Sequence, residues 1–368
     1  MERRTELEID RNENLVNEYK GTLFEYLVAS KLSKNFSLES SFVESLTDDL
    51  KEMLYFYERS IRAVDSELVD ALPFLAQKVV ESIEKNIKQI KKIKKIYWVG
   101  KSKVGLNLEA NGLLNEKMIN LAEADLLIDV DTDIDTDIDT DSDTSRDSNF
   151  GLIPISIKLS KANSFVNTKN GGVQSFISKY FAYERAPFFQ SVLNSKIEEC
   201  YNNLGEGLYS LANLKFNGEF DRRWIECGYS ELPGELPANM RILVLEYYSQ
   251  IISLIFQNCL YFYNEDRMLF FRSLYPLLGL GNNSITQIIC FHGKDSVSKK
   301  RYALKGLHLI SYNELLKQHD KIIIGEHKKG QSSFEIIHPD FTLQIRVKPM
   351  NKFTARAAKV NCSVKYKS

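Results

Sequence analysis

Two short segments place an aspartate and a lysine where they could act together on a phosphodiester. Asp125 precedes the apolar run 126–128, which predicts a strand. In the run 155–158, apolar and polar residues alternate, so Ser156 and Lys158 share one face of a second strand. Carboxylate oxygens hold Mg²⁺, and a nearby lysine stabilises the charge that develops in the transition state. Taken singly, such an aspartate is more often a turn residue and such a lysine a solvated strand end.

The hydrophobic pattern predicts an α/β or α+β protein rather than a regular doubly wound sheet. Helices are expected at 14–33, at 46–92 with a break near Pro73, after the two glycines at 171–172, in part of 182–228, and at 240–278. Strands are expected at 94–100, 124–130, 152–160, 285–291, 307–310, 321–325, 333–337, 341–348 and 359–366. The Pro- and Gly-rich stretch 231–237 suggests two parts, 1–235 and 236–368.

Several segments together resemble the core of the PD-(D/E)xK nucleases. They are KGTLFEYLVA, WVGK, EADLLI and ISIKLSKANSFVNTKNGG. The chain carries Ser156 where that motif usually has an acid, and this S-x-K variant is similar to the HaeIII-type type II restriction endonucleases. The segment FTLQIRVKPMNKFTARAAKVNCSVKY is similar to the carboxy-terminal strands of those enzymes. The resemblance covers residues 15–35, 95–180 and 335–366.

The resemblance implies a restriction-endonuclease-like core in 1–235, with a mixed β-sheet flanked by helices. It also implies that 236–368 holds a helical segment and a β-rich carboxy-terminal DNA-recognition region. It implies that Asp125 and Glu25 are ligands of a Mg²⁺ cofactor and that Lys158 is the catalytic lysine. Ser156 would supply only a neutral hydroxyl to the catalytic site, so Glu25 would have to contribute the missing charge. Asp129, four residues after Asp125, is a second candidate ligand.

The function that the resemblance implies is Mg²⁺-dependent, sequence-specific hydrolysis of double-stranded DNA, as in phage defence. The site would be a short GC-rich palindrome such as GGCC, and a cognate DNA methyltransferase would protect the host. A palindrome would suit a homodimer, but monomeric enzymes also exist in this fold. Two alternatives stay open: a catalytically inactive DNA-binding module on the same fold, and a modification-dependent or structure-specific nuclease.

Candidate DNA contacts occur in two regions. Short polar residues at 161–172 are expected to form a turn leading into a helix amino terminus, where backbone N–H groups bind phosphate. The cationic tail could contact phosphates or guanine edges. The candidates are Lys161, Asn163, Asn167, Thr168, Lys169, Gln174, Arg346, Lys348, Asn351, Arg356 and Lys359.

Charge is strongly segregated along the chain. Residues 129–147 hold nine Asp and one Arg, whereas the whole chain has a net charge of −1, so the remainder carries +7. The stretches 85–103 and 341–368 contain no acid. A basic surface with one acidic patch is typical of nucleic-acid binders, and solvated lysine-rich faces are the alternative. An EF-hand is excluded for the Asp repeat, because Ile134 and Thr140 stand where Gly and Glu are needed. We expect 130–148 to be an extended or disordered loop.

The remaining motifs exclude several other classes of protein. No signal peptide or membrane span is expected, and five scattered cysteines indicate reduced thiols in a cytoplasmic protein. The five histidines form no HxxxH motif, and no phosphate-binding glycine loop or nucleophile elbow occurs.

Overall fold

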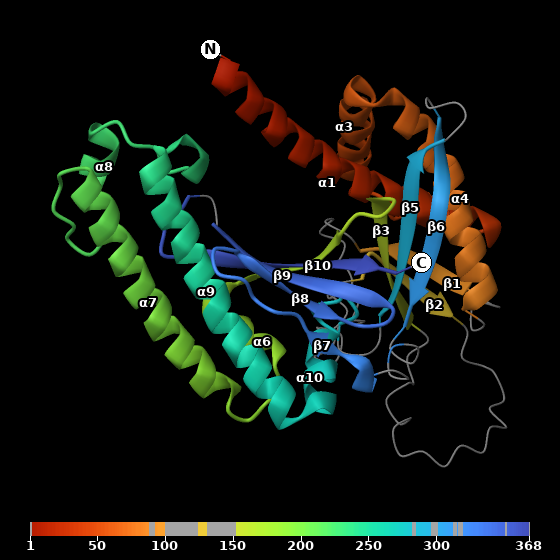
Figure 1. The fold of residues 1–368 in the computed structure, drawn as a ribbon. Coiled ribbons are helices and arrows are strands. Elements are labelled where there is room, and N and C mark those ends of the chain that lie inside the picture. Colours follow the sequence, from red (N-terminus) through yellow and green to blue (C-terminus); the bar gives the residue numbers. More distant parts are fainter. Residues whose placement is uncertain are drawn as a thin grey trace. The chain divides into compact units, whose positions relative to one another are not determined.

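The computed structural model describes residues 2–87, 93–99, 124–130, 152–281, 285–295, 301–311, 315, 319–349 and 352–367. Within these residues the protein has helices and two five-stranded sheets, which confirms the predicted α+β class (Figure 1). The Asp repeat at 131–147 and Asn351 lie outside the described residues. Among the described residues, no helix has the length and apolar character needed to cross a membrane.

The chain divides into two compact units, each assembled from separated segments. The first unit comprises Met1–Ser164 and Leu280–Glu314, and the second comprises Phe165–Gly279 and Leu315–Ser368. The backbone therefore passes between the units three times. The stretch 231–237, expected to lie between two parts of the chain, falls inside the second unit.

The helices of the first unit precede its sheet in the sequence. They are α1 (Glu2–Asn35), α2 (Glu39–Glu44), α3 (Asp48–Val64) and α4 (Ser66–Asn86). The break expected near Pro73 lies instead at Asp65, and Pro73 is inside α4. Asp65 has a non-helical backbone, with φ of −151°, and its carboxylate accepts a hydrogen bond from the Leu68 N–H at 3.1 Å. This helix-capping contact begins a new helix at the next residue.

The sheet of the first unit has the order β1-β2-β3-β5-β6. Its strands are β1 (Ile93–Trp98), β2 (Leu126–Val130), β3 (Leu152–Lys161), β5 (Thr286–Lys294) and β6 (Tyr302–Ile310). The β3–β5 pair is parallel and the other pairs are antiparallel. A parallel neighbour requires a long connection, and here the chain passes through the second unit between β3 and β5.

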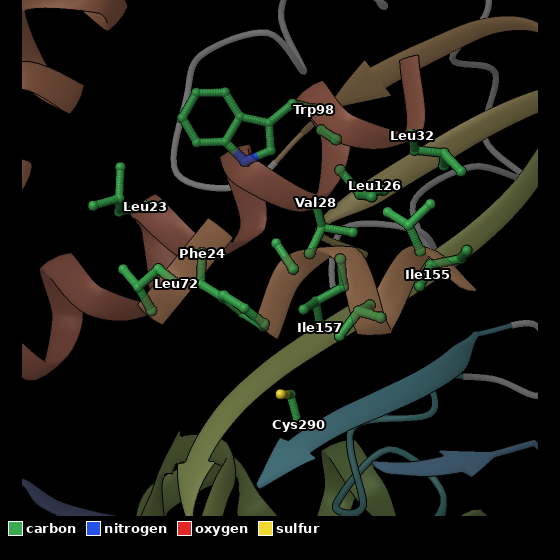
Figure 2. Packing of buried hydrophobic residues seen from close by; sticks show 14 of the residues in the cluster. Leu23, Phe24, Val28, Leu32, Leu72, Trp98, Leu126, Ile155, Ile157 and Cys290 are labelled. Carbon is green, nitrogen blue, oxygen red and sulfur yellow. The ribbon is translucent and has the colours of Figure 1, made fainter. Parts of the chain in front are cut away.

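The core of this unit decides which way β3 presents its side chains. Phe24 and Val28 of α1 pack in one buried cluster with Ile155 and Ile157 of β3 (Figure 2). Because successive side chains of a strand point to opposite faces, Ser156 and Lys158 are directed away from the side that Ile155 and Ile157 occupy. The apolar alternation in β3 therefore determines where its polar residues lie.

The second unit combines helices with an antiparallel sheet of order β4-β10-β9-β8-β7. Its strands are β4 (Val166–Gly172), β7 (Ile323–Ile324), β8 (Ser333–Ile337), β9 (Phe341–Pro349) and β10 (Ala358–Tyr366). Its helices are η2 (Val173–Ser175), α6 (Phe176–Tyr180), α7 (Ala186–Leu211), α8 (Arg222–Glu226), η3 (Pro233–Glu235), α9 (Ala238–Glu265), α10 (Arg267–Leu274) and η4 (His319–Lys321). Residues 166–172, expected to form a turn, are strand β4, because they pair along β10.

Candidate active site

Asp125 is held at the start of β2 by backbone contacts on both sides. Its N–H donates to the Ile155 carbonyl at 2.9 Å, and its own carbonyl accepts from the Val99 N–H at 3.0 Å. The chain bends at Asp125, and the regular β2 ladder begins at the next residue. The Asp125 peptide is therefore positioned by both neighbouring segments, while its side chain can turn toward β3.

Three donors from β3 converge on one carboxylate oxygen of Asp125. Oδ2 accepts from the Ile157 N–H at 2.6 Å, from Ser156 Oγ at 3.1 Å and from Lys158 Nζ at 3.2 Å. Such convergence restricts the rotation of the carboxylate. Among the described residues, Oδ1 accepts no hydrogen bond, so this oxygen can take another ligand. Asp125 is only 9% exposed, which strengthens these contacts.

Lys158 forms an ion pair with Asp125 inside a partly enclosed site. About a quarter of its side chain is exposed (26%), against 12% for Asp125. Burial acts to lower the pKa of Lys158, but the negative charges of Asp125 and Glu25 outweigh it, and the net pKa is raised. Lys158 is therefore a cation at neutral pH, suited to stabilising negative charge rather than to accepting a proton.

Glu25 brings a second carboxyl group to this site from α1. Burial, followed by the negative charge of Asp125, raises its pKa to about 8, although Lys158 and the nearby Trp98 indole favour the ionised form. Below that pH the metal-free Glu25 is mainly protonated. A strongly raised carboxyl pKa beside a charged partner is typical of functional sites. The structure thus brings Glu25, Asp125, Ser156 and Lys158 together, through hydrogen bonds to Asp125 and the charge interactions of Glu25.

Asp129 does not share this site. Asp129 lies opposite Leu152 of β3, whereas Leu126 lies opposite Ile155. Because the two strands are antiparallel, moving along β2 from Asp125 to Asp129 means moving back along β3, away from Lys158. Four residues of strand also separate the two aspartates by about 13 Å.

The candidate DNA contacts of the first unit lie at the far end of β3. Lys161 is the exposed last residue of the strand and pairs in register with His292 of β5. Asn163 is exposed and has a φ of 60°, a left-handed conformation that asparagine tolerates better than most residues. Both remain candidate contacts.

Several candidates of the second unit make contacts within that unit instead. Thr168 donates to the carbonyls of Leu277 and Cys362, at 2.6 and 3.2 Å, which is a structural role. Lys169 Nζ lies 5.6 Å from the centre of the Tyr180 ring, and burial, then Lys179, lowers its pKa.

Gln174 and Arg356 lie on other elements of this unit. Gln174 is exposed on η2, and its carbonyl accepts from Asn194. Arg356 pairs with Glu198 and donates to the Gly218 carbonyl, so much of its guanidinium is engaged. Neither residue lies on a strand of the sheet, so strand register does not place either of them beside the remaining candidates.

The other candidates lie on one sheet. Arg346 and Lys348 alternate along β9, Lys359 is opposite Lys348 on β10, and Asn167 is on the adjoining β4. The sequence placed these residues in two separate regions, and strand pairing brings them to one surface.

Gln287 is a candidate that the sequence analysis missed. It is fully buried on β5 and in parallel register with Ser156, so its amide lies on the same side of the sheet as Ser156 and Lys158. The available signal was a glutamine inside the apolar strand ITQIICF. An amide at this position can hydrogen-bond to groups of the site.

The site offers few protein ligands to a metal ion. The described residues contain no cluster of three or more His, Cys, Asp or Glu side chains suited to a metal. Asp125 Oδ1, the Glu25 carboxylate and the Ser156 hydroxyl are all hard oxygen donors, the kind that Mg²⁺ prefers, and Mg²⁺ commonly keeps several waters. The donor set therefore fits a hydrated Mg²⁺ better than a structural zinc site.

Comparison of the chain with protein-family models, with curated proteins and with solved structures gives no match.

Proposed function

We propose that this chain is a Mg²⁺-dependent, sequence-specific endonuclease for double-stranded DNA, of the type II restriction type. The observation that carries the proposal is the convergence of Ser156, Ile157 N–H and Lys158 on one oxygen of Asp125, with Glu25 in electrostatic contact. The first unit, with α1 beside β1 and β3, would be the restriction-endonuclease-like core.

Asp125 and Glu25 would hold the metal ion, through Oδ1 and the raised-pKa carboxyl group respectively. A bound Mg²⁺ would polarise the scissile phosphate and lower the pKa of a coordinated water. Two carboxylates would leave coordination positions for waters and phosphate oxygens, which is common for this ion.

Lys158 would act electrostatically. Its raised pKa keeps it protonated, and the bond to Asp125 Oδ2 holds its ammonium group at the site before the substrate arrives. A preorganised cation stabilises a transition state in which charge builds up on phosphate oxygens. The Ile157 N–H and the Ser156 hydroxyl would keep Asp125 in position.

The test is digestion of plasmid DNA by the full chain with Mg²⁺, with EDTA, and with Lys158→Ala in Mg²⁺. Discrete fragments that require both Mg²⁺ and Lys158 support the proposal, and sequencing their ends gives the site. Expression would need a methyltransferase of the same specificity to protect the host. Discrete fragments from the Lys158→Ala protein would contradict the assignment of Lys158.

A second candidate is a catalytically inactive DNA-binding module, which Ser156 favours because it removes a carboxylate from the strand. Specific binding without cleavage in Mg²⁺ would support that function. Ragged products, or products that depend on DNA modification or structure, would instead support a structure-specific or modification-dependent nuclease.

A further inference from the structure

The second unit has a sheet with one apolar and one polar face. On β9, Phe341, Leu343, Ile345 and Val347 are buried, whereas the alternating residues are half-buried or exposed. β10 shows the same alternation. Phe334 of β8 meets Phe256 of α9 with ring centres 5.3 Å apart, so the apolar face packs on that helix. The opposite face, which we call the open face, carries hydrogen-bonding side chains.

Strand register arranges these side chains into two rows that cross four strands. Side chains paired in register on neighbouring strands lie on the same face. The first row is Ser333, Arg346, Asn361 and Asn170, and the second is Glu335, Gln344, Ser363 and Asn167. Four strands span about 14 Å. The rows are therefore comparable in width with the major groove of B-DNA, which is about 12 Å wide.

Hydrogen bonds between the side chains hold the amides of the rows in place. Asn361 Nδ2 donates to Asn170 Oδ1 at 2.6 Å and to Asn167 Oδ1 at 3.0 Å, and Ser363 Oγ donates to Asn361 Oδ1 at 2.9 Å. The amide oxygens of all three asparagines thus accept bonds within the cluster. Asn167 and Asn170 are exposed, and among the described residues their Nδ2 groups donate no hydrogen bond. Preorganised donors lose less entropy when they bind a ligand.

A second hydrogen-bonded chain orients Arg346. Its Nη2 donates to Gln344 Oε1 at 2.7 Å, and Gln344 Nε2 lies 3.5 Å from Glu335 Oε1. Among the described residues, the other N–H groups of the Arg346 guanidinium donate no hydrogen bond, so they can contact a ligand. Guanine presents two acceptors, N7 and O6, in the major groove, and a guanidinium is the side chain that most often contacts both.

Lysines lie beyond both rows along the strands. Lys348 and Lys359 are directly opposite each other, a like-charge pair that destabilises a sheet unless an anion lies nearby. Lys365 lies beyond the second row, about 20 Å from Lys359 along β10. Among the described residues of these strands, the open face carries Arg346 and three lysines against the acid Glu335, and Glu326 and Lys328 line the same surface beside Arg346. This charge pattern is complementary to the phosphates on either side of a groove.

We propose that the open face reads base edges of double-stranded DNA, with Arg346 and the Asn361 amide cluster as the specificity-determining groups and the lysines as phosphate contacts. The choice of DNA as the polyanion rests on the proposed function. The described residues of the rows include no aromatic side chain, and single-stranded nucleic acid is usually held on aromatic stacking surfaces. This composition favours a duplex.

The test is selection of duplexes from a random-sequence DNA pool by the full chain in EDTA, followed by affinity measurements on the selected sequence. We expect Arg346→Ala to weaken specific binding about tenfold or more and to relax the consensus at one position. Asn361→Asp, which keeps the shape but adds a charge, should lower specific affinity similarly. The matched control is Arg222→Ala, which removes an arginine of α8 whose side chain is 90% exposed. It should change neither the specific affinity nor the consensus sequence.

Lys359→Ala should weaken binding to all sequences and make the salt slope shallower by about one. Thermal melting of each variant checks that the unit is folded. Folded variants of Arg346 and Asn361 with unchanged affinity and consensus would overturn the inference, as would tighter binding of single strands or of duplex RNA.

The outcomes also separate this inference from the proposed function. A wild-type protein that cuts DNA in Mg²⁺, with face variants that cut the same site at the same rate, would overturn the role of the face alone. Sequence-selective binding that depends on Arg346 and Asn361, without any cleavage in Mg²⁺, would overturn the nuclease function and support the face.

Discussion

Replacing Glu25 by glutamine should make the metal-free protein more stable while it abolishes cleavage. Burial and the neighbouring Asp125 raise the pKa of Glu25 from 4.5 to about 8. In the unfolded chain the carboxyl ionises near its ordinary pKa, so the stability linked to its protonation is full below pH 4.5 and is lost as the pH rises through 8. A glutamine at this position would carry no such penalty, because its amide stays neutral in both states.

The size of the effect follows from the shift. One pKa unit corresponds to 1.36 kcal/mol, so the full shift from 4.5 to about 8 would give about 5 kcal/mol above pH 8, and solvent relaxation around a half-buried group reduces this to about 2 kcal/mol. For a unit of this size, the melting temperature should rise by about 4–8 °C.

The assay is thermal melting in EDTA at pH 5 and pH 9, with plasmid cleavage in Mg²⁺ measured in parallel. The rise in melting temperature of Glu25→Gln over wild type should be small at pH 5 and large at pH 9. Glu52→Gln, which changes an exposed residue of α3, is the control and should show neither effect. A Glu25→Gln protein that melts lower than wild type at pH 9 would show that Glu25 is a structural partner and would refute this reasoning. Full retention of cleavage would remove Glu25 from the site.

Three further changes test other parts of the structure. Lys158→Ala should lower cleavage by at least about a hundredfold and leave specific DNA binding largely intact, because the ammonium acts in the transition state. Equal losses of cleavage and binding would contradict this role of Lys158, as would a similar loss of cleavage in the control Lys196→Ala. Burial and the neighbouring lysines lower the pKa of His292 to about 4, so the free energy of unfolding should fall as the pH drops from 6.5 to 4. Denaturant titrations of His292→Phe should show a weaker pH dependence. A Gly/Ser linker in place of residues 131–147 removes negative charge, so it should strengthen non-specific DNA binding below roughly 0.1 M salt. The cleaved sequence should stay unchanged. Loss of all cleavage in a folded variant would instead place the metal site in the repeat.

Periodicity predicted most of the elements, because amphipathic patterns report burial directly. The apolar spacing at 14–33 corresponds to part of α1, and the alternation at 152–160 corresponds to β3. Two predictions were wrong for local reasons. The helix break lies at Asp65, whose carboxylate caps α4, and Pro73 lies inside that helix. The Asn- and Gly-rich segment 166–172 did not form a turn, because pairing with β10 satisfies its backbone.

Long-range pairing is what local patterns cannot supply. The parallel pairing of β3 with β5 joins residues separated by about 130 positions, and only that register places Gln287 beside Ser156. The same holds for the second sheet, where β4 joins β10 and brings Asn167 and Asn170 to Asn361. The sequence therefore indicated which residue types could do chemistry in each segment, but not which segments meet.

Ser156 is best understood through the charge of the metal-free site. Its hydroxyl donates to Asp125 Oδ2 at 3.1 Å, in the place where an acid would set a second carboxylate against the first. Glu25 already shows the cost of one more acid nearby, since its pKa is raised to about 8. With Lys158 balancing Asp125 and Glu25 mainly protonated at neutral pH, the metal-free cluster is close to electrically neutral. A third acid would add a negative charge that no other cation of this cluster balances. Under the proposed function, the serine would thus allow a partly buried polar site to fold without a metal ion, and Glu25 would supply the second negative charge when a cation binds.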